Sequence, residues 1–252
     1  MTTQRLAERG IDRLTGMQRE VLDERRRVRA ELDAVQADDG DRNRTADGVR
    51  AERETRRRKV REHAVVRGER LADDVEQAWA GIGAYTRRAG EVRPADAEAT
   101  AREGAAWQRI EPIMRARGPA RVLRDADVDE CRAFLRNIAR WLDLADAERV
   151  ASGRDGLIGA ARVANGEGAG ESREALILAA RERLADALAD AGERDEAERL
   201  RMRLSGERLV EAARAAVEGF ITEHRAEAEG RPSAGIGLRS ALASRSMARG
   251  TA

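Results

Sequence analysis

The 252-residue sequence has few aromatic residues, a single cysteine and a single lysine. Aromatic residues make up 2% of the chain, and much of its 41% hydrophobic content is alanine. Because burying alanine removes little apolar area from water, a core of ordinary size can form only in parts of the chain. The lone cysteine, Cys131, has no intramolecular partner for a disulfide.

Long hydrophobic runs are also missing. No apolar stretch approaches the roughly 18 residues that a transmembrane helix needs, and the N-terminus lacks the apolar core of a signal peptide. We therefore expect a cytoplasmic protein without a membrane span.

The sequence shows no constellation of catalytic groups or metal ligands. Its two histidines, His63 and His224, lie far apart without further histidine or cysteine ligands nearby, and we expect both on exposed helix surfaces. Cys131 falls on an apolar helical stripe, which favours a buried structural thiol over a nucleophile. We predict that the chain is not an enzyme and that it holds no cofactor and no metal.

Two short patterns imitate ligand sites. The run DADVDE (125–130) suggests a calcium loop, but an EF-hand needs glycine at position six and glutamate at position twelve, where this chain has Glu130 and Arg136. We interpret these acids as the start of a helix, with Asp125 or Asp127 as its cap. The glycines of NGEGAGES (165–172) follow no apolar strand and precede no Gly-Lys-Ser/Thr, so they do not indicate a nucleotide loop.

Charged residues are abundant, at 38% of the chain, but they nearly cancel to a net charge of +1. Residues 1–90 carry +3, residues 230–252 carry +4, and the segment between them is left with −6. Alanine, arginine, glutamate and leucine dominate, and all four favour helices. This composition is typical of coiled coils and long helices, so we predict an all-α fold.

A seven-residue apolar repeat marks residues 3–37 as one long helix. Such a repeat is typical of a left-handed coiled coil, although packing on a neighbouring helix of the same chain explains it equally well. Gln18 and Arg25 interrupt its second row. The residues predicted to mediate self-association are Ile11, Leu14, Val21, Val28, Leu32 and Val35.

The remaining helices divide the chain into three parts. A short turn and a second helix over about 45–88 predict an arginine-rich hairpin, residues 1–90. A helical bundle should span 94–229, and a flexible basic tail should span 230–252. Within the bundle we expect helices over 95–117, 126–145, 157–163, 174–191 and 193–228, with Pro112 kinking the first and Gly206 interrupting the last.

A basic block lies in the middle of the second predicted helix. Such a block usually forms a solvated helix face, and the glutamates around it partly neutralise it. The alternative is nucleic-acid binding through phosphate contacts, without base stacking because few aromatic residues lie nearby. The candidate residues are Arg53, Arg56, Arg57, Arg58, Lys59 and Arg61.

The patterns RGIDR (9–13) and GDRNR (40–44) resemble a stretch just beyond the nicking domain of conjugative mobilisation relaxases, which continue into arginine- and glutamate-rich helices. The resemblance covers about residues 9–44. Nicking in that family uses a tyrosine nucleophile and a metal-bound histidine cluster, whereas this chain has one tyrosine, Tyr85, and two isolated histidines. The resemblance therefore implies an accessory module and not a nicking enzyme.

From the sequence we predict a non-enzymatic interaction or scaffold protein that self-associates through coiled-coil-like helices or binds another helical protein. The first alternative is an accessory DNA-binding or conjugation factor associated with a relaxase or a type IV secretion system. The second alternative is a phage or virion structural protein, because helical scaffolding proteins share this composition.

Overall fold

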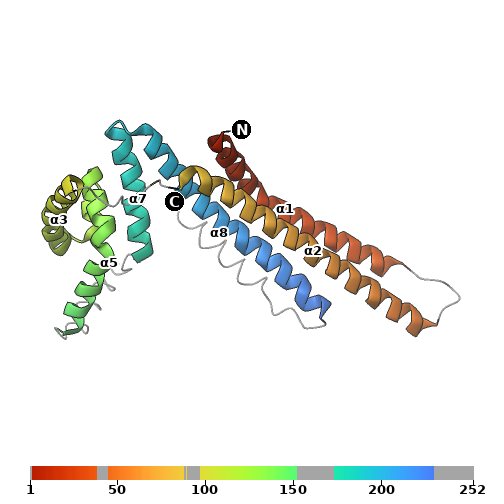
Figure 1. Cartoon of the computed structure of the whole chain (residues 1–252). Helices are drawn as coiled ribbons and strands as arrows, with labels where there is room; N and C mark the ends of the chain where they lie inside the picture. Colours follow the sequence, from red (N-terminus) through yellow and green to blue (C-terminus); the bar gives the residue numbers. More distant parts are fainter. Residues whose placement is uncertain (1, 39–44, 88, 90–96, 152–172, 230–252) are drawn as a thin grey trace, which may run out of the picture. The chain divides into compact units, whose positions relative to one another are not determined.

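The computed structural model describes residues 2–38, 45–87, 89, 97–151 and 173–229. These residues form seven α-helices, shown in Figure 1. The predicted all-α fold with a long N-terminal hairpin is confirmed. The helices are α1 (Thr3–Ala37), α2 (Ala46–Thr86), α3 (Ala97–Arg117), α4 (Pro119–Leu123), α5 (Val128–Ala151), α7 (Arg173–Asp190) and α8 (Arg194–Ala228).

The chain folds into two compact units, and each is described by itself. Unit 1 comprises residues 1–85 and 205–252, and unit 2 comprises residues 86–204. The sequence predicted a division near residue 90, but it assigned all of the last helix to the bundle. In the structure, α8 from Ser205 onward belongs to the first unit. Helix α8 also runs through Gly206 without the predicted interruption.

Unit 1 is a three-helix assembly in which α1, α2 and α8 lie side by side (Figure 1). Helix α2 runs antiparallel to both of its neighbours. Gly10 and Glu24 of α1 lie against Ala78 and Arg67 of α2, and Gly206 and Ile221 of α8 lie against Ile82 and Gly68 of α2. Their shared core is the seam of unit 1. Its buried residues are Leu14, Met17, Val21, Val28, Ala64, Leu71, Val75, Ile82, Val210, Ala213, Val217 and Phe220.

The seam follows seven-residue rows on all three helices, but the second row on α1 differs from the prediction. The structure buries Gly10 and Met17, four residues before and three after Leu14, while Gln18 is exposed. The reason is the close approach of α1 to α2. A Cβ added at Gly10 would lie 2.6 Å from the Ala78 carbonyl oxygen, so only glycine fits that contact.

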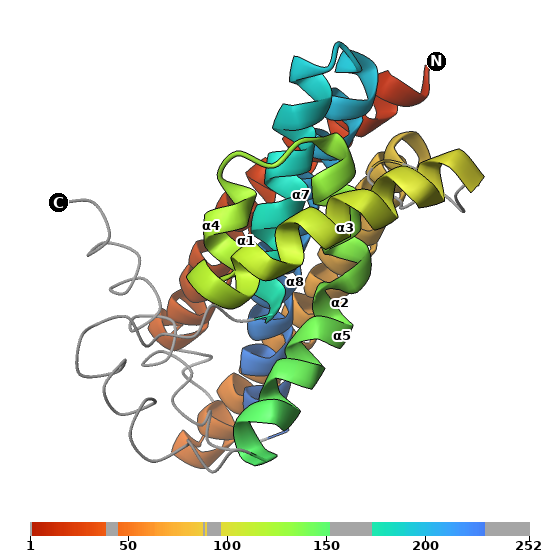
Figure 2. The same ribbon diagram turned by 90° about the vertical axis from the view of Figure 1, so that its left-hand side faces the viewer.

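Unit 2 packs α5 against α3 and α7, and the short α4 contacts α3 and α7 (Figure 2). Phe134 and Ile138 of α5 are fully buried, as the 3–4 spacing predicted. The short helix α4 was not predicted from the sequence. It begins directly after Gly118, whose φ of 83° ends α3, and Pro119 occupies its first turn without losing a hydrogen bond.

A Schellman motif ends α7 in the same unit. Gly192 has a φ of 87°, its N–H donates to the Ala189 carbonyl, and the N–H of Glu193 donates to the Leu188 carbonyl (2.8 Å). The predicted tail (230–252), the helix candidate 157–163 and the glycine-rich run 165–172 lie outside the described residues.

Candidate functional site

The arginine block lies on α2 near the end of α1. Arg56 pairs with Asp38, which follows the last turn of α1, and with Glu52 one turn earlier on α2 (2.9 Å). Arg53 donates to the backbone oxygen of Asp38 (3.0 Å). The structure therefore brings two of the candidate nucleic-acid residues together on one α1 terminus.

Other members of the block are also engaged within the chain. Arg57 donates to Gln36 of α1, and Arg58 pairs with Glu62 one turn later (3.3 Å). Lys59 is exposed and forms no ion pair with another described residue. Each paired arginine would have to exchange its present partner for a phosphate, so nucleic-acid binding stays a prediction.

A charged layer replaces apolar residues where α1, α2 and the end of α8 meet. Arg67 of α2 lies 3.0 Å from Glu24 and 3.4 Å from Glu31, both on α1. The Arg67 and Glu24 side chains are only 23% and 18% exposed. Arginine and glutamate thus occupy places beside the seam that leucine or valine would fill in an ordinary bundle.

Helix α8 contributes to this layer from the other side. Glu223 lies 3.3 Å from Arg25 of α1, and Glu227 lies 3.0 Å from Arg61 of α2. The last member of the arginine block, Arg61, therefore joins α2 to the end of α8. We call this layer the charged end of unit 1; its residues are Glu24, Arg25, Glu31, Arg61, Arg67, Glu223, His224 and Glu227.

The charged end is close in distance but poorly hydrogen-bonded. The Nε atoms of Arg25, Arg61 and Arg67 and one oxygen of Glu24 are buried without a hydrogen bond to any described residue. Nε of Arg67 lies 3.0 Å from that Glu24 oxygen, but its N–H does not point along the contact. Buried polar atoms left in this state carry a desolvation cost, so the charged end is the weaker part of the seam.

His224 corrects the prediction of two exposed histidines. His63 is exposed as expected, but His224 is only 5% exposed and packs edge-on against Phe220, with ring centroids 4.7 Å apart. His224 continues the row of Val210 and Val217 at seven-residue spacing, and this signal was present in the sequence.

The predicted self-association row is largely used inside the chain. Leu14, Val21 and Val28 are buried in the seam, and Ile11 and Leu32 pack partly against it. The intramolecular alternative therefore accounts for these residues. Val35, near the end of α1, is only half-buried and is absent from the seam core.

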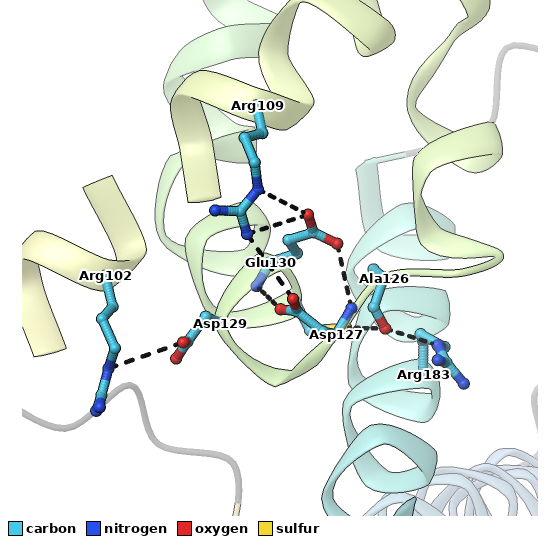
Figure 3. Close-up of polar contacts among 8 residues, drawn as sticks. Arg102, Arg109, Ala126, Asp127, Asp129, Glu130 and Arg183 are labelled. Carbon is cyan, nitrogen blue, oxygen red and sulfur yellow. Dashed lines mark hydrogen bonds and ion pairs between the residues drawn. The ribbon is translucent and has the colours of Figure 1, made fainter. Parts of the chain in front are cut away.

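The acidic run before α5 forms a helix cap, as predicted, with Asp127 as the capping residue. A carboxylate oxygen of Asp127 accepts the Glu130 N–H (2.8 Å), and Glu130 accepts the Asp127 N–H in return (3.2 Å), as Figure 3 shows. Arg109 of α3 donates to Glu130 (3.3 Å), and Arg102 lies 3.8 Å from Asp129. These acids therefore begin α5 and join it to α3.

Cys131, in the first turn of α5, is fully buried. Burial raises the pKa of its thiol to about 12, although nearby Arg183 acts in the opposite direction. The thiol therefore stays protonated at neutral pH and suits the predicted structural role.

No protein-family model, no curated protein and no solved structure matches this chain. Within the described ranges, no group of three or more histidine, cysteine or acidic side chains is arranged to hold a metal ion. None of the described helices is long and apolar enough to cross a membrane. The resemblance to mobilisation relaxases stays a prediction; its first pattern lies on α1, and its second, 40–44, lies outside the described residues.

Proposed function

We propose that the chain is a non-enzymatic helical interaction protein that self-associates through the tip of its α1–α2 hairpin. The tip comprises residues 32–38 of α1 with its cap and residues 45–60 at the start of α2. The observation that supports this is the length of the hairpin. Helix α8 ends beside Arg61, while α2 continues for 15 residues beyond, about 22 Å of helix (Figure 1).

No described helix covers the tip as α8 covers the rest of the seam. Among the described residues, α8 reaches only the base of the tip, where Val60 packs against the seam, and beyond it Val35 and Val49 are half-buried between α1 and α2. A two-stranded hairpin with a half-covered apolar strip gains stability by adding further helices, as helix-in-groove complexes do. A second copy of the tip would supply two helices at once and complete a four-helix contact.

The charges of the tip suit a second copy. Residues 32–38 hold two acids and no base, a net charge of −2, whereas residues 45–60 hold six bases and three acids, a net charge of +3. In an antiparallel pairing, α1 of each copy lies against α2 of the other, so opposite charges meet. Charge complementarity of this kind fixes orientation and register more than it adds affinity.

Sedimentation equilibrium of the full chain tests this proposal. We expect a dimer or larger species, and we expect V35E combined with V49E to raise the dissociation constant more than about tenfold, because it puts charge on apolar contacts. The matched control is L22E with V66E, since these apolar side chains are 51% and 46% exposed and lie outside the tip. A wild-type chain that stays monomeric at micromolar concentrations would overturn the proposal.

Nucleic-acid binding by the arginine block is the second candidate, and the exposed Lys59, which forms no ion pair with another described residue, favours it. Binding to duplex DNA should be sequence-independent, and the slope of log K against log salt should be about −0.9 per phosphate contact. K59Q should weaken the slope by about one contact, while R56Q, R57Q and R58Q together should remove about three. If the wild type does not shift duplex DNA at low salt, the arginines serve only as the solvated face of the tip.

A further inference from the structure

One buried group in unit 1 has no role in the proposed assembly. His224 lies in the last two turns of α8, 5% exposed, and neither ring nitrogen forms a hydrogen bond with another described residue. Phe220 packs edge-on against one side of the ring, with an interplanar angle of 78°. An imidazole in such a site is accommodated as a neutral group, because a buried charge without a hydrogen bond is costly.

The groups that face His224 come from all three helices. Arg25 of α1 and Arg61 of α2 are positive, while Glu223 and Glu227 of α8 itself are negative. Each glutamate is already paired, Glu223 with Arg25 and Glu227 with Arg61. A proton on the imidazole would therefore place a third positive charge beside two guanidinium groups whose counter-charges are engaged.

The electrostatic environment agrees with this geometry. Burial is the main cause that lowers the pKa of His224 below its ordinary value of 6.5, and Arg25 and Arg61 lower it further, against Glu223 and Glu227. A histidine of this kind takes up its proton more readily when the helix end opens. By linkage, the closed state loses stability as pH falls below about 6.5, and its stability is fully present above that value.

We propose that His224 makes the charged end of unit 1 a pH-sensitive contact, in which acidification charges the imidazole and releases the end of α8 from the α1–α2 hairpin. The release would extend from the end of α8 back to Phe220 and Ile221, which pack on Gly68 so closely that a Cβ there would lie 2.6 Å from Ile221. It would uncover the part of the α1–α2 groove that borders the hairpin tip. The inference does not depend on self-association.

Hydrogen exchange of the full chain tests the proposal, with amides of residues 217–228 followed at pH 7.5 and pH 5.5 and corrected for intrinsic exchange rates. In the opened state the histidine is exposed and has its ordinary pKa of 6.5. The equilibrium constant for opening should therefore rise by up to about tenfold from pH 7.5 to pH 5.5. Amides of unit 2 serve as the internal reference and should change little. Unchanged protection of residues 217–228 would overturn the proposal.

The two histidines of the chain provide a matched pair of substitutions. H224L and H224Q should both abolish the pH dependence, and H63Q, on the exposed face of α2, should retain it. If the H224L variant does not fold, the H224Q variant alone tests whether the pH dependence comes from His224. Retention of the effect in H224Q, or its loss in H63Q, would contradict the assignment to His224.

A titration of the wild-type chain tests the proposal without a substitution at position 224. Proton NMR should resolve two imidazole signals, assigned with H63Q. The His224 signal should titrate below pH 6.5. A His224 signal that titrates at or above pH 6.5 would overturn the proposal.

Discussion

The two ends of unit 1 use the same three helices in different ways. Around Leu14, Val75 and Val210 the seam is apolar and fully buried. Around Arg67 and His224 the neighbouring positions hold charged or polar side chains, and several of their buried atoms lack a hydrogen bond to any described residue. At the apolar end, the seven-residue rows stabilise the assembly by removing apolar area from water. At the charged end, the ion pairs add little net stability, because their attraction is offset by the cost of desolvating the charges.

The largest effect should follow truncation at the apolar end. L14A removes a side chain that is 1% exposed and should lower the free energy of unfolding by about 2–5 kcal/mol. L22A, on the exposed face of the same helix, should stay within about 0.5 kcal/mol. Urea denaturation measures both, and equal losses would mean that α1 does not pack in the register described.

Close helix contact at the apolar end is tested with two glycines of α1. G10A should destabilise by about 1–3 kcal/mol, because its Cβ would meet the Ala78 backbone. G16A has nothing within 4 Å of its added Cβ and should stabilise the helix by about 0.5–1 kcal/mol. Thermal unfolding of the two variants compares them, and a shared sign would refute the close approach.

These glycines also show what the sequence could predict. Helix positions followed from composition and from rows such as Leu14, Val21 and Val28. The contacts at Gly10 and Gly68 could not be predicted, because glycine adds no apolar signal to a helical row, although each permits a close contact between helices. The pairing of α8 with the hairpin is non-local, so no local pattern identified it. His224 could have been predicted, because it continues the row of Val210 and Val217.

At the charged end, the effect of a substitution depends on what remains. R67L removes the cation beside the Glu24 oxygen that faces α2, while Arg27 still donates to the other oxygen (2.8 Å), and it should cost about 1–3 kcal/mol. Adding E24L removes the carboxylate from this helix contact and should recover most of that loss, since apolar replacements of buried ion pairs are often neutral or stabilising. A double variant as unstable as the sum of the single changes would show that this end depends on its charges for stability.

The smallest effect is expected at an exposed pair between α2 and α8. Arg214 binds Glu76 through two contacts of 2.7 Å, and this hydrogen bonding lowers the pKa of Glu76 below 4.5. The contribution is present above about pH 4.5 and is lost as pH falls through the lowered value. E76Q should therefore cost at most about 1 kcal/mol at pH 7, and its difference from wild type should shrink in acid.

Native-state hydrogen exchange along α2 tests most directly the claim that the charged end opens separately from the apolar end. Residues 61–68 and 72–79 both lie inside a helix that runs from Ala46 to Thr86, so fraying affects neither. We predict that residues 61–68 exchange through local openings that are insensitive to denaturant, with at least about tenfold lower protection, ~1.4 kcal/mol, than residues 72–79. Equal protection with the same denaturant dependence in both segments would contradict the account.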